Sequence, residues 1–440
     1  MFLTINDGWQ LFSLLLILVS FGFLCWRKPV YSVVTILFLA PTYLLKVNSW
    51  PLTVLELFLL VFFGCWLSKK TKERAKIKDI LSSLLTIFGS SYFLAVALIL
   101  FGVLISVILS TDWHVGAGVF KAWILEPIIF GLILAEIIKN RKEIKEVIFG
   151  IIAATFFVAV ISLTYKLFGW LTFDGRLSGW YLSPNHLAMY LAPGFILAWW
   201  GLFIGERKKQ KIFFGLVVLI LGLALYLTFS YGAWLGILGA ILAGLFLTHR
   251  SGLTEKRKII IAGLLVLILF LTLGCWQGES EKLSNLLNFD RSSWQSRLMV
   301  WQAADKILDS HWLFGVGPGL FQKYYLEYQS FFSVPYLEWA VPQPHNLFLA
   351  WWLQGGILGL IGFLLLLIVY FKKIILVKQK PLFAQDGASR GRQLIGIFLA
   401  AVVVYILIHG LVDTTYWKND LALVFWSIVS LSYIAIRCSD

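Results

Sequence analysis

The chain has 440 residues, of which 60% are hydrophobic and only 14% are charged, and its formal net charge is +14. Soluble proteins are about 45–50% apolar and about 25% charged. Together with a mean hydropathy of +0.84, this composition excludes an ordinary soluble domain. Apolar stretches of about twenty residues recur along the chain, which is the length that crosses a bilayer as a helix.

These stretches predict an all-α, polytopic transmembrane protein with twelve or thirteen spans. The weakest candidate is 30–45, because it is short and Pro41, Lys46 and Pro51 lie in it or soon after it. If it does not cross, both ends of the chain lie on the same side of the membrane. The candidate spans are residues 8–26, 30–45, 52–67, 92–110, 115–135, 147–165, 187–205, 212–229, 232–248, 259–276, 346–370, 394–411 and 421–436.

The connectors between these spans are of two kinds, and one kind is crowded with Lys and Arg. The basic connectors are 69–78, 139–145, 206–211, 249–258 and 372–392. By the positive-inside rule they face the cytoplasm, and the remaining connectors face outward. Topology therefore accounts for the positive net charge, and we expect no nucleic-acid partner.

The longest outward connector divides the chain into three parts. Residues 1–276 form the N-terminal transmembrane helices, 277–345 an extracytoplasmic loop, and 346–440 the C-terminal transmembrane helices. Within the loop, 295–310 carries apolar residues at helical spacing, and an aromatic-rich segment follows GVGPG at 315–319. This pattern predicts short amphipathic helices that lie against the lipid headgroups.

The polar residues that stand out against the apolar background gather at the outward ends of the spans, so we place the candidate site there. His345 follows two prolines at the water boundary, where an imidazole with a pKa near 6.5 can accept a proton. The alternative role is a capping or interfacial histidine. The candidate site residues are Arg176, Asn185, His186, Tyr231, Arg297, His345 and Asn346, together with the intramembrane Lys121.

Positive charge at this face has more than one interpretation. Arg297 opens the loop helix and could hold a phosphate or pyrophosphate through its planar guanidinium. It could equally anchor a lipid headgroup or pair with Asp290 or Asp305. Lys121 lies within a span and is a functional candidate for that reason, although it could also snorkel to the surface. Asn185 and His186 could line the same cavity or cap the span at 187–205.

Two kinds of bound group are not indicated. GVGPG lacks the following Gly-Lys-Ser/Thr of a phosphate-binding loop. The six histidines and four cysteines lack the short spacing of metal ligands. The sequence therefore predicts no metal and no cofactor.

Four segments together resemble the O-antigen ligase and O-antigen polymerase family of integral membrane glycosyltransferases. They are LSPNHLAMYLAPG at 182–194, TFSYGAWLGILGA at 228–240, SRLMVWQAADKILDSHWLFGVGPGLF at 296–321 and PHNLFLAWWLQGGILGLIGF at 344–363. The third and fourth are the most specific, because they occur in this order and flank the long loop.

The resemblance implies transfer or polymerisation of glycan from an undecaprenyl-pyrophosphate-linked donor to a glycan or lipid acceptor. The reaction would occur at the outer face of a bacterial cytoplasmic membrane, among membrane lipids. His345 would correspond to the histidine that helps to activate the acceptor hydroxyl, and Arg297 to the arginine that engages the pyrophosphate. Ligase and polymerase share this architecture, so both activities stay open.

Two positions depart from the family pattern. Tyr231 stands where the family commonly has an arginine, and Gln354 stands where a glutamate commonly precedes the glycine pair. Another base, such as Lys121 or Arg176, could supply the missing charge, the donor could differ, or activity could be reduced. A second hypothesis is a transporter or flippase of lipid-linked glycan, which would use Glu56, Lys121 and Glu126 as its buried charges.

Overall fold

The computed structural model describes residues 3–5, 7–47, 50–74, 76–204, 207–250, 293–329, 338–376 and 387–437. These residues are nearly all helical, and eight of their helices are long and apolar enough to cross a membrane. The chain is therefore a multi-pass, all-α membrane protein, as its composition predicts. The predicted span 259–276 and Asp290 lie outside the described residues.

All but one of the long helices begin and end near the predicted spans. The long helices are α1 (Gly8–Arg27), α3 (Val54–Lys72), α5 (Ser90–Ile108), α7 (Glu126–Ile137), α8 (Arg141–Leu167), α9 (Pro184–Ile204), α10 (Lys208–Leu227), α11 (Tyr231–Arg250), α14 (Ser293–His311), α16 (Leu347–Leu376), α17 (Gly387–His409) and α18 (Asn419–Arg437). The exception is α14, which lies in the long outward connector. Local sequence explains where two of these helices start. The hydroxyl of Thr53 accepts a hydrogen bond from the backbone N–H of Glu56 at the start of α3, and the side-chain oxygen of Asn140 accepts one from the N–H of Glu143 at the start of α8.

The span predicted at 30–45 is not one helix. It consists of α2 (Pro29–Phe38) and a 3₁₀ helix (Ala40–Leu44), followed by the strand β2 (Leu45–Val47). This strand pairs in parallel with β1 (Leu3–Ile5), which precedes α1. Because α1 carries the chain about 30 Å away from β1, the segment 29–44 must return it by a similar distance. The segment therefore crosses, so it stays among the predicted spans.

One described helix was not predicted. α4 (Ile77–Phe88) follows the basic segment at the end of α3, and it is amphipathic, with Leu84, Ile87 and Phe88 buried and Ile77 exposed. Its 12 residues are too few to cross a bilayer. No span was predicted here because Lys and Asp side chains interrupt the apolar pattern on one face.

The predicted span 115–135 contains a local change of helix type. α6 (Trp113–Val119) continues through a π-helical turn (Phe120–Leu125) into α7. A π turn shifts the backbone hydrogen bonds and leaves a carbonyl available. The hydroxyl of Tyr416 donates to the backbone carbonyl of Trp123 at 2.8 Å, so the connector before α18 is fixed to the middle of this span.

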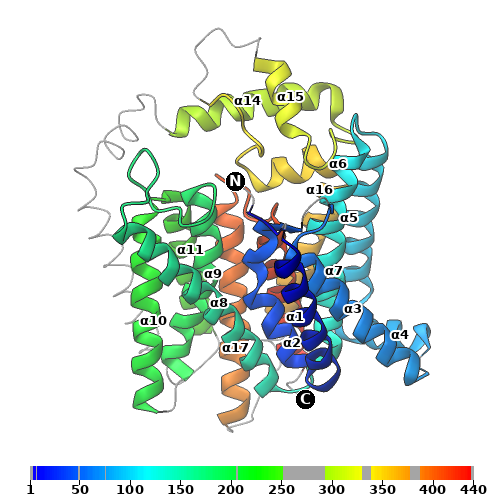
Figure 1. Cartoon of the computed structure of the whole chain (residues 1–440), viewed down its shortest axis with the longest axis vertical. Helices are drawn as coiled ribbons and strands as arrows, with labels where there is room; N and C mark the ends of the chain where they lie inside the picture. The colour runs from blue at the N-terminus through cyan, green and yellow to red at the C-terminus, as the bar shows by residue number, and fades with distance from the viewer. Residues whose placement is uncertain are drawn as a thin grey trace.

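The loop helices lie across one end of the bundle. α14 carries the first of the two helical patterns predicted in the long connector, and α15 (Phe321–Tyr328) carries the second. In Figure 1 both helices cover the end of the bundle opposite to the end where the C-terminus is marked. The described part of this connector thus forms a cap over the ends of the spans.

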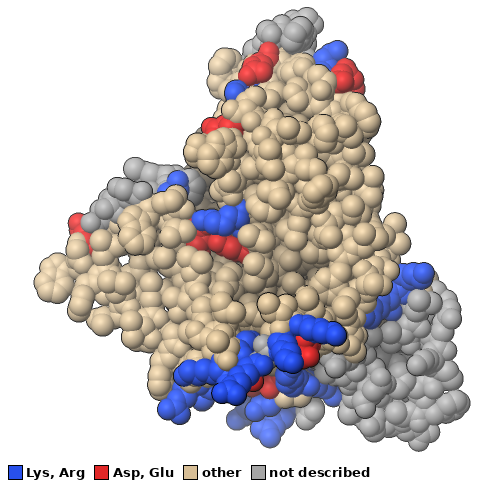
Figure 2. Space-filling model, turned by 90° about the vertical axis from the view of Figure 1, so that its right-hand side faces the viewer, with Lys and Arg blue, Asp and Glu red and all other residues tan. Residues whose placement is uncertain are grey.

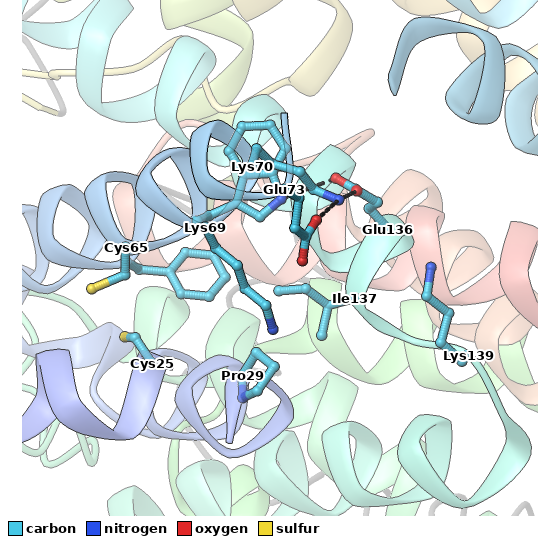
Figure 3. Close-up of a pocket in the computed structure, with 11 residues that line it drawn as sticks. Cys25, Pro29, Cys65, Lys69, Lys70, Glu73, Glu136, Ile137 and Lys139 are labelled. Atoms are coloured by element: carbon cyan, nitrogen blue, oxygen red, sulfur yellow. Dashed lines mark hydrogen bonds and ion pairs between the residues drawn. The ribbon is translucent and has the colours of Figure 1, made fainter. Parts of the chain in front are cut away.

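Basic side chains gather at the other end of the molecule, away from α14 and α15 (Figure 2). Three segments meet there around a pocket of about 210 Å³. Cys25 at the end of α1, Lys69 at the end of α3 and Lys139 after α7 each line it (Figure 3). Within the pocket Lys70 forms an ion pair with Glu136. Basic connectors that are far apart in sequence therefore share one end of the bundle, as the positive-inside pattern requires.

The strand pairing gives a direct test of whether segment 29–44 crosses the membrane. Thr4 and Lys46 are register partners, so a Thr4→Cys/Lys46→Cys variant in a cysteine-free background should form a disulfide under mild oxidation. Gel mobility before and after reduction measures it. The control pair Asp7→Cys/Lys46→Cys is three residues out of register and should stay reduced. Equal cross-linking of both pairs, or of neither, would contradict the pairing.

Candidate active site

Arg176 lies in the connector between α8 and α9 and contacts two other segments. Its Nε donates a hydrogen bond to the backbone carbonyl of Thr228 (2.7 Å), and a terminal guanidinium nitrogen donates to Oδ1 of Asn185 (2.8 Å). The amide nitrogen of Asn185 donates in turn to Oδ2 of Asp413 (3.0 Å). The side chain of Asn185 thus joins Arg176 to the connector between α17 and α18.

Arg297 reaches the same connector from the loop. It lies near the start of α14, and its Nε donates to the backbone carbonyl of Val412 at 2.6 Å. The two arginines are close enough to repel one another: burial lowers the pKa of Arg176, and the charge of Arg297 adds to that effect against the opposing charges of Asp174 and Asp413. Two guanidinium groups from distant segments therefore converge.

Both arginines line one pocket of about 170 Å³ at the end of the bundle covered by the loop helices. Asn185 and Tyr231 also line it, so the pocket contains four of the eight predicted site residues. The ring of Tyr231 packs edge-on against Trp234 (5.6 Å between ring centroids). The lining residues are Arg176, Asn185, Phe229, Ser230, Tyr231, Gly232, Leu235, Trp294, Arg297 and Val412.

His345 lies beside this pocket, between two carboxylates. Its Nδ1 is 3.3 Å from Oδ1 of Asp413, and its Nε2 is 3.5 Å from Oε2 of Glu338. Burial disfavours the imidazolium, but the hydrogen bonds and charges of the two carboxylates outweigh burial and raise the pKa of His345 to about 9. The expectation of a pKa near 6.5 is therefore wrong: in this arrangement His345 is an imidazolium at neutral pH.

Asp413 and Glu338 were not predicted as site residues. Asp413 is buried (3% exposed), and His345 together with Arg297 holds the pKa of its carboxyl well below its usual value despite burial. His345 likewise lowers the pKa of Glu338, although partial desolvation of that carboxyl acts in the opposite direction. The signal in the sequence was slight, since Asp413 is one of two acids in a short outward connector and Glu338 is one of several acids in the loop.

The backbone around His345 is held in an unusual conformation. His345 has a φ of 47°, a left-handed value that is uncommon for a residue with a side chain. The indole nitrogen of Trp301 donates to the carbonyl of Pro344 at 3.1 Å, and the backbone of Leu347 donates to Gly410 at 2.6 Å. These contacts hold the backbone on both sides of His345. Strained residues of this kind concentrate at functional sites.

Asn346 has a structural role at the start of α16. Its Oδ1 accepts hydrogen bonds from the backbones of Phe348 (2.9 Å) and Leu349 (3.0 Å), which caps the helix. Its amide nitrogen donates to the carbonyl of Leu411 at 3.0 Å. The side chain therefore ties the start of α16 to the connector that also binds Arg297, and it does not line the pocket.

Lys121 and His186 do not line the pocket either. Lys121 forms an ion pair with the buried Glu56 at 2.7 Å. The Nε2 atom of His186 lies 3.4 Å from both Oδ1 of Asp420 and the hydroxyl of Tyr43. The backbone of His186 donates to the hydroxyl of Ser183, which caps α9. The structure thus separates these two predicted residues from the other members of the site.

A break in α16 docks the loop onto the bundle. At Gly356 the backbone leaves the helical region (φ 63°, ψ −173°), and a Cβ there would lie 2.5 Å from the carbonyl oxygen of Leu313, so only glycine fits. The break frees two backbone groups of α16 to bond with the loop. The carbonyl of Leu353 accepts from the backbone N–H of Val316 (2.6 Å), and the N–H of Ile357 donates to the carbonyl of Leu313 (3.0 Å). The turn at 315–319 is thereby bonded to α16.

Gln354 reinforces this docking. Its Oε1 accepts from the backbone of Gly319 at 3.0 Å, and its Nε2 donates to Oε1 of Gln343 at 2.8 Å. Gln343 lies two residues before His345, so the amide joins the glycine-rich turn to the segment that carries the histidine. An ionised glutamate at this position could accept the first hydrogen bond but could not donate the second.

One comparison with known proteins identifies a related family. Residues 216–364 match the family model described as O-antigen ligase, a stretch that includes Tyr231, Arg297 and His345. No curated protein matches the chain. The protein is a multi-pass membrane protein whose residues 216–364 match the O-antigen ligase family model, which confirms the resemblance for the three quoted segments within that range.

The raised pKa of His345 predicts a pH-dependent contribution to stability. A histidine whose pKa is raised on folding stabilises the fold fully below its unfolded pKa of about 6.5 and loses that contribution as pH rises through about 9. Wild type should therefore exceed His345→Gln in unfolding free energy by on the order of 2–3 kcal/mol at pH 6.5. This advantage should disappear by about pH 10.

Thermal unfolding of the detergent-solubilised protein between those pH values measures the difference. His114→Gln is a matched control, because His114 is an exposed histidine outside this cluster. A wild-type advantage that stays constant from pH 6.5 to 10 would mean that the two carboxylates do not stabilise the imidazolium.

Proposed function

We propose that the protein is a membrane glycosyltransferase that transfers or polymerises glycan from an undecaprenyl-pyrophosphate-linked donor. One observation carries this proposal: Arg176 and Arg297 line a single pocket, and both are joined through residues 412–413 to His345. The domain in residues 216–364 supports a lipid-linked glycan as the substrate class. Such a donor already contains an activated sugar, so the proposed step uses side chains alone.

The two arginines suit the leaving group. A pyrophosphate diester carries two negative charges, one on each phosphate, and each guanidinium can donate two parallel hydrogen bonds to phosphate oxygens. In transfer, the bond between the anomeric carbon and the pyrophosphate oxygen breaks while the acceptor oxygen bonds to that carbon. Charge then develops on the departing pyrophosphate, where Arg176 and Arg297 would stabilise it.

Arg176 takes the role that the family pattern gives to an arginine at position 231. Tyr231 lines the same pocket as Arg176, so the charge missing from α11 is supplied from the connector before α9. Lys121, the other candidate for this substitution, is paired with Glu56 and lies outside the pocket lining. That pair also neutralises two of the three charges on which a transport pathway through the spans would depend.

His345 would act on the acceptor through Nε2. Its Nδ1 faces the buried Asp413, whereas Nε2 faces Glu338, whose side chain is 41% exposed at the rim. An acceptor hydroxyl that displaces Glu338 would meet Nε2 directly and would remove one of the two carboxylates that raise the pKa of His345. The ring could then lose its proton and accept the proton of the attacking hydroxyl.

The proposed site faces away from the cytoplasm. Trp294 and Arg297 of α14 line the pocket, and α14 lies across one end of the bundle (Figure 1). Lys and Arg side chains gather at the opposite end (Figure 2). By the positive-inside rule that basic end is cytoplasmic. In a bacterial cytoplasmic membrane the pocket would open to the periplasm or exterior, where glycan, lipid and wall-polymer acceptors are accessible.

The role of Arg176 can be tested by moving the charge. Arg176→Gln should reduce glycan transfer by roughly 10- to 100-fold, since a charge-assisted hydrogen bond contributes about 1.5–3 kcal/mol. Adding Tyr231→Arg to Arg176→Gln should restore part of the activity, because both side chains line one pocket. Product formation by the reconstituted protein, with lipid-linked glycan and acceptor, measures both effects.

Lys323→Gln is the control, because Lys323 is a cation of the loop that bonds to Thr111 outside the pocket. Melting temperatures of all variants separate lost folding from lost activity. If Arg176→Gln folds and retains full transfer, or if Tyr231→Arg restores nothing in a folded double variant, Arg176 does not supply the missing charge.

The pH profile tests the role of His345. If the ring must be neutral to accept a proton, transfer should rise with pH as the imidazolium deprotonates. Glu338→Gln removes a charge that raises the pKa of His345, so this rise should move to lower pH. Glu327→Gln, an exposed acid on α15, should leave the profile in place. A profile that falls with pH, or one that Glu338→Gln does not move, would oppose His345 as the base.

A further inference from the structure

A second cavity lies at the basic end of the molecule, far from the candidate active site in the fold. It has a volume of about 650 Å³ and is bounded by four helices. Its lining includes Tyr31 of α2, Lys142 of α8, Trp200 of α9 and Gln210 of α10. α8 packs against each of the other three helices. The cavity therefore lies between spans and not within a loop.

An apolar pocket of about 220 Å³ adjoins this cavity. The two share Phe149 and Ile152 of α8, and the second is lined almost wholly by apolar side chains, among them Phe38, Phe157 and Phe213. Phe38, Phe149, Phe157 and Phe213 are between 37% and 47% exposed. Side chains of this kind are exposed on a spanning helix where they face lipid. The two pockets thus form one groove that is polar at the basic end and apolar along the span.

The polar end of the groove holds donors. Lys142 and Lys145 project from the first turns of α8, and Lys142 makes a long, 3.8 Å contact with Glu146, which also lines the cavity. Trp200 is 2% exposed, and its buried indole nitrogen has no hydrogen-bond partner among the described residues. A buried donor without a partner is costly unless a bound group accepts from it.

The length of the groove matches one leaflet. From Ile148 to Phe157, both on α8, nine residues rise about 14 Å, close to half of a hydrocarbon core that is about 30 Å thick. A molecule that fills the groove would have an anionic or polar head at the basic end and an apolar chain of about one leaflet's depth.

We propose that this groove binds one anionic phospholipid of the leaflet at the basic end. Its phosphate lies at Lys142 and Lys145, an ester oxygen accepts from the Trp200 indole, and one acyl chain follows Phe149 and Phe157. The polyprenyl donor is not the occupant, because its pyrophosphate is proposed to bind at the opposite end. This site does not depend on the proposed glycosyl transfer.

Native mass spectrometry of the purified full-length protein tests the proposal. Phosphatidylglycerol, phosphatidylcholine and undecaprenyl phosphate are added separately, and the retained lipid is counted. Wild type should retain phosphatidylglycerol in preference to phosphatidylcholine. Lys142→Ala/Lys145→Ala should weaken phosphatidylglycerol retention by roughly fivefold per lysine. Ala153→Phe, which fills the apolar pocket that Ala153 lines, should abolish retention without changing charge.

The matched control is Lys69→Ala/Lys139→Ala, which removes two exposed lysines from the neighbouring basic pocket in Figure 3. It should retain phosphatidylglycerol as wild type does. Equal loss in this control would show attraction to surface charge alone, and full retention by a folded Ala153→Phe would show that no chain enters the groove. Equal retention of the two phospholipids, or tighter retention of undecaprenyl phosphate, would also overturn the proposal.

Discussion

The carboxylate of Asp413 connects the two halves of the candidate site, because each of its oxygens binds a different part of the chain. One oxygen lies 3.3 Å from the ring of His345, and the other accepts from Asn185, which is bonded to Arg176. A buried carboxylate is costly unless it is paired and hydrogen-bonded. Here His345 and Asn185 provide that pairing, and the proposed transfer needs both of them close together. The same contacts therefore stabilise the fold and set the geometry of the site.

The connector between α17 and α18 extends this coupling to the loop. Its carbonyl groups accept from Asn346, Leu347 and Arg297, and its Tyr416 bonds to the π turn before α7. The break at Gly356 binds the glycine-rich turn from the other side. The loop helices are therefore fixed at several points over the pocket, which favours a site assembled before substrate arrives.

The fold was largely predictable from the sequence, since apolar length and the distribution of Lys and Arg reflect the physics of the bilayer directly. Segment 30–45 was ambiguous because its helix ends at Phe38, and only the pairing of β1 with β2 shows that the chain returns. At the site, Arg176 and Arg297 were found because Lys and Arg are few in the outward connectors. Asp413 was missed because its importance comes from partners far away in sequence, and the raised pKa of His345 follows from those same partners.

The two ends of the molecule have different chemistry. Two arginines and His345 lie at or beside the pocket at one end, and Lys and Arg side chains gather at the other (Figure 2). The central claim concerns the first end, and cryo-electron microscopy of the full-length protein with a lipid-linked donor bound tests it most directly. We expect phosphate oxygens within hydrogen-bonding distance of both Arg176 and Arg297, with the first sugar facing His345. A pyrophosphate bound at Lys121, at the basic end, or against neither arginine would contradict the account.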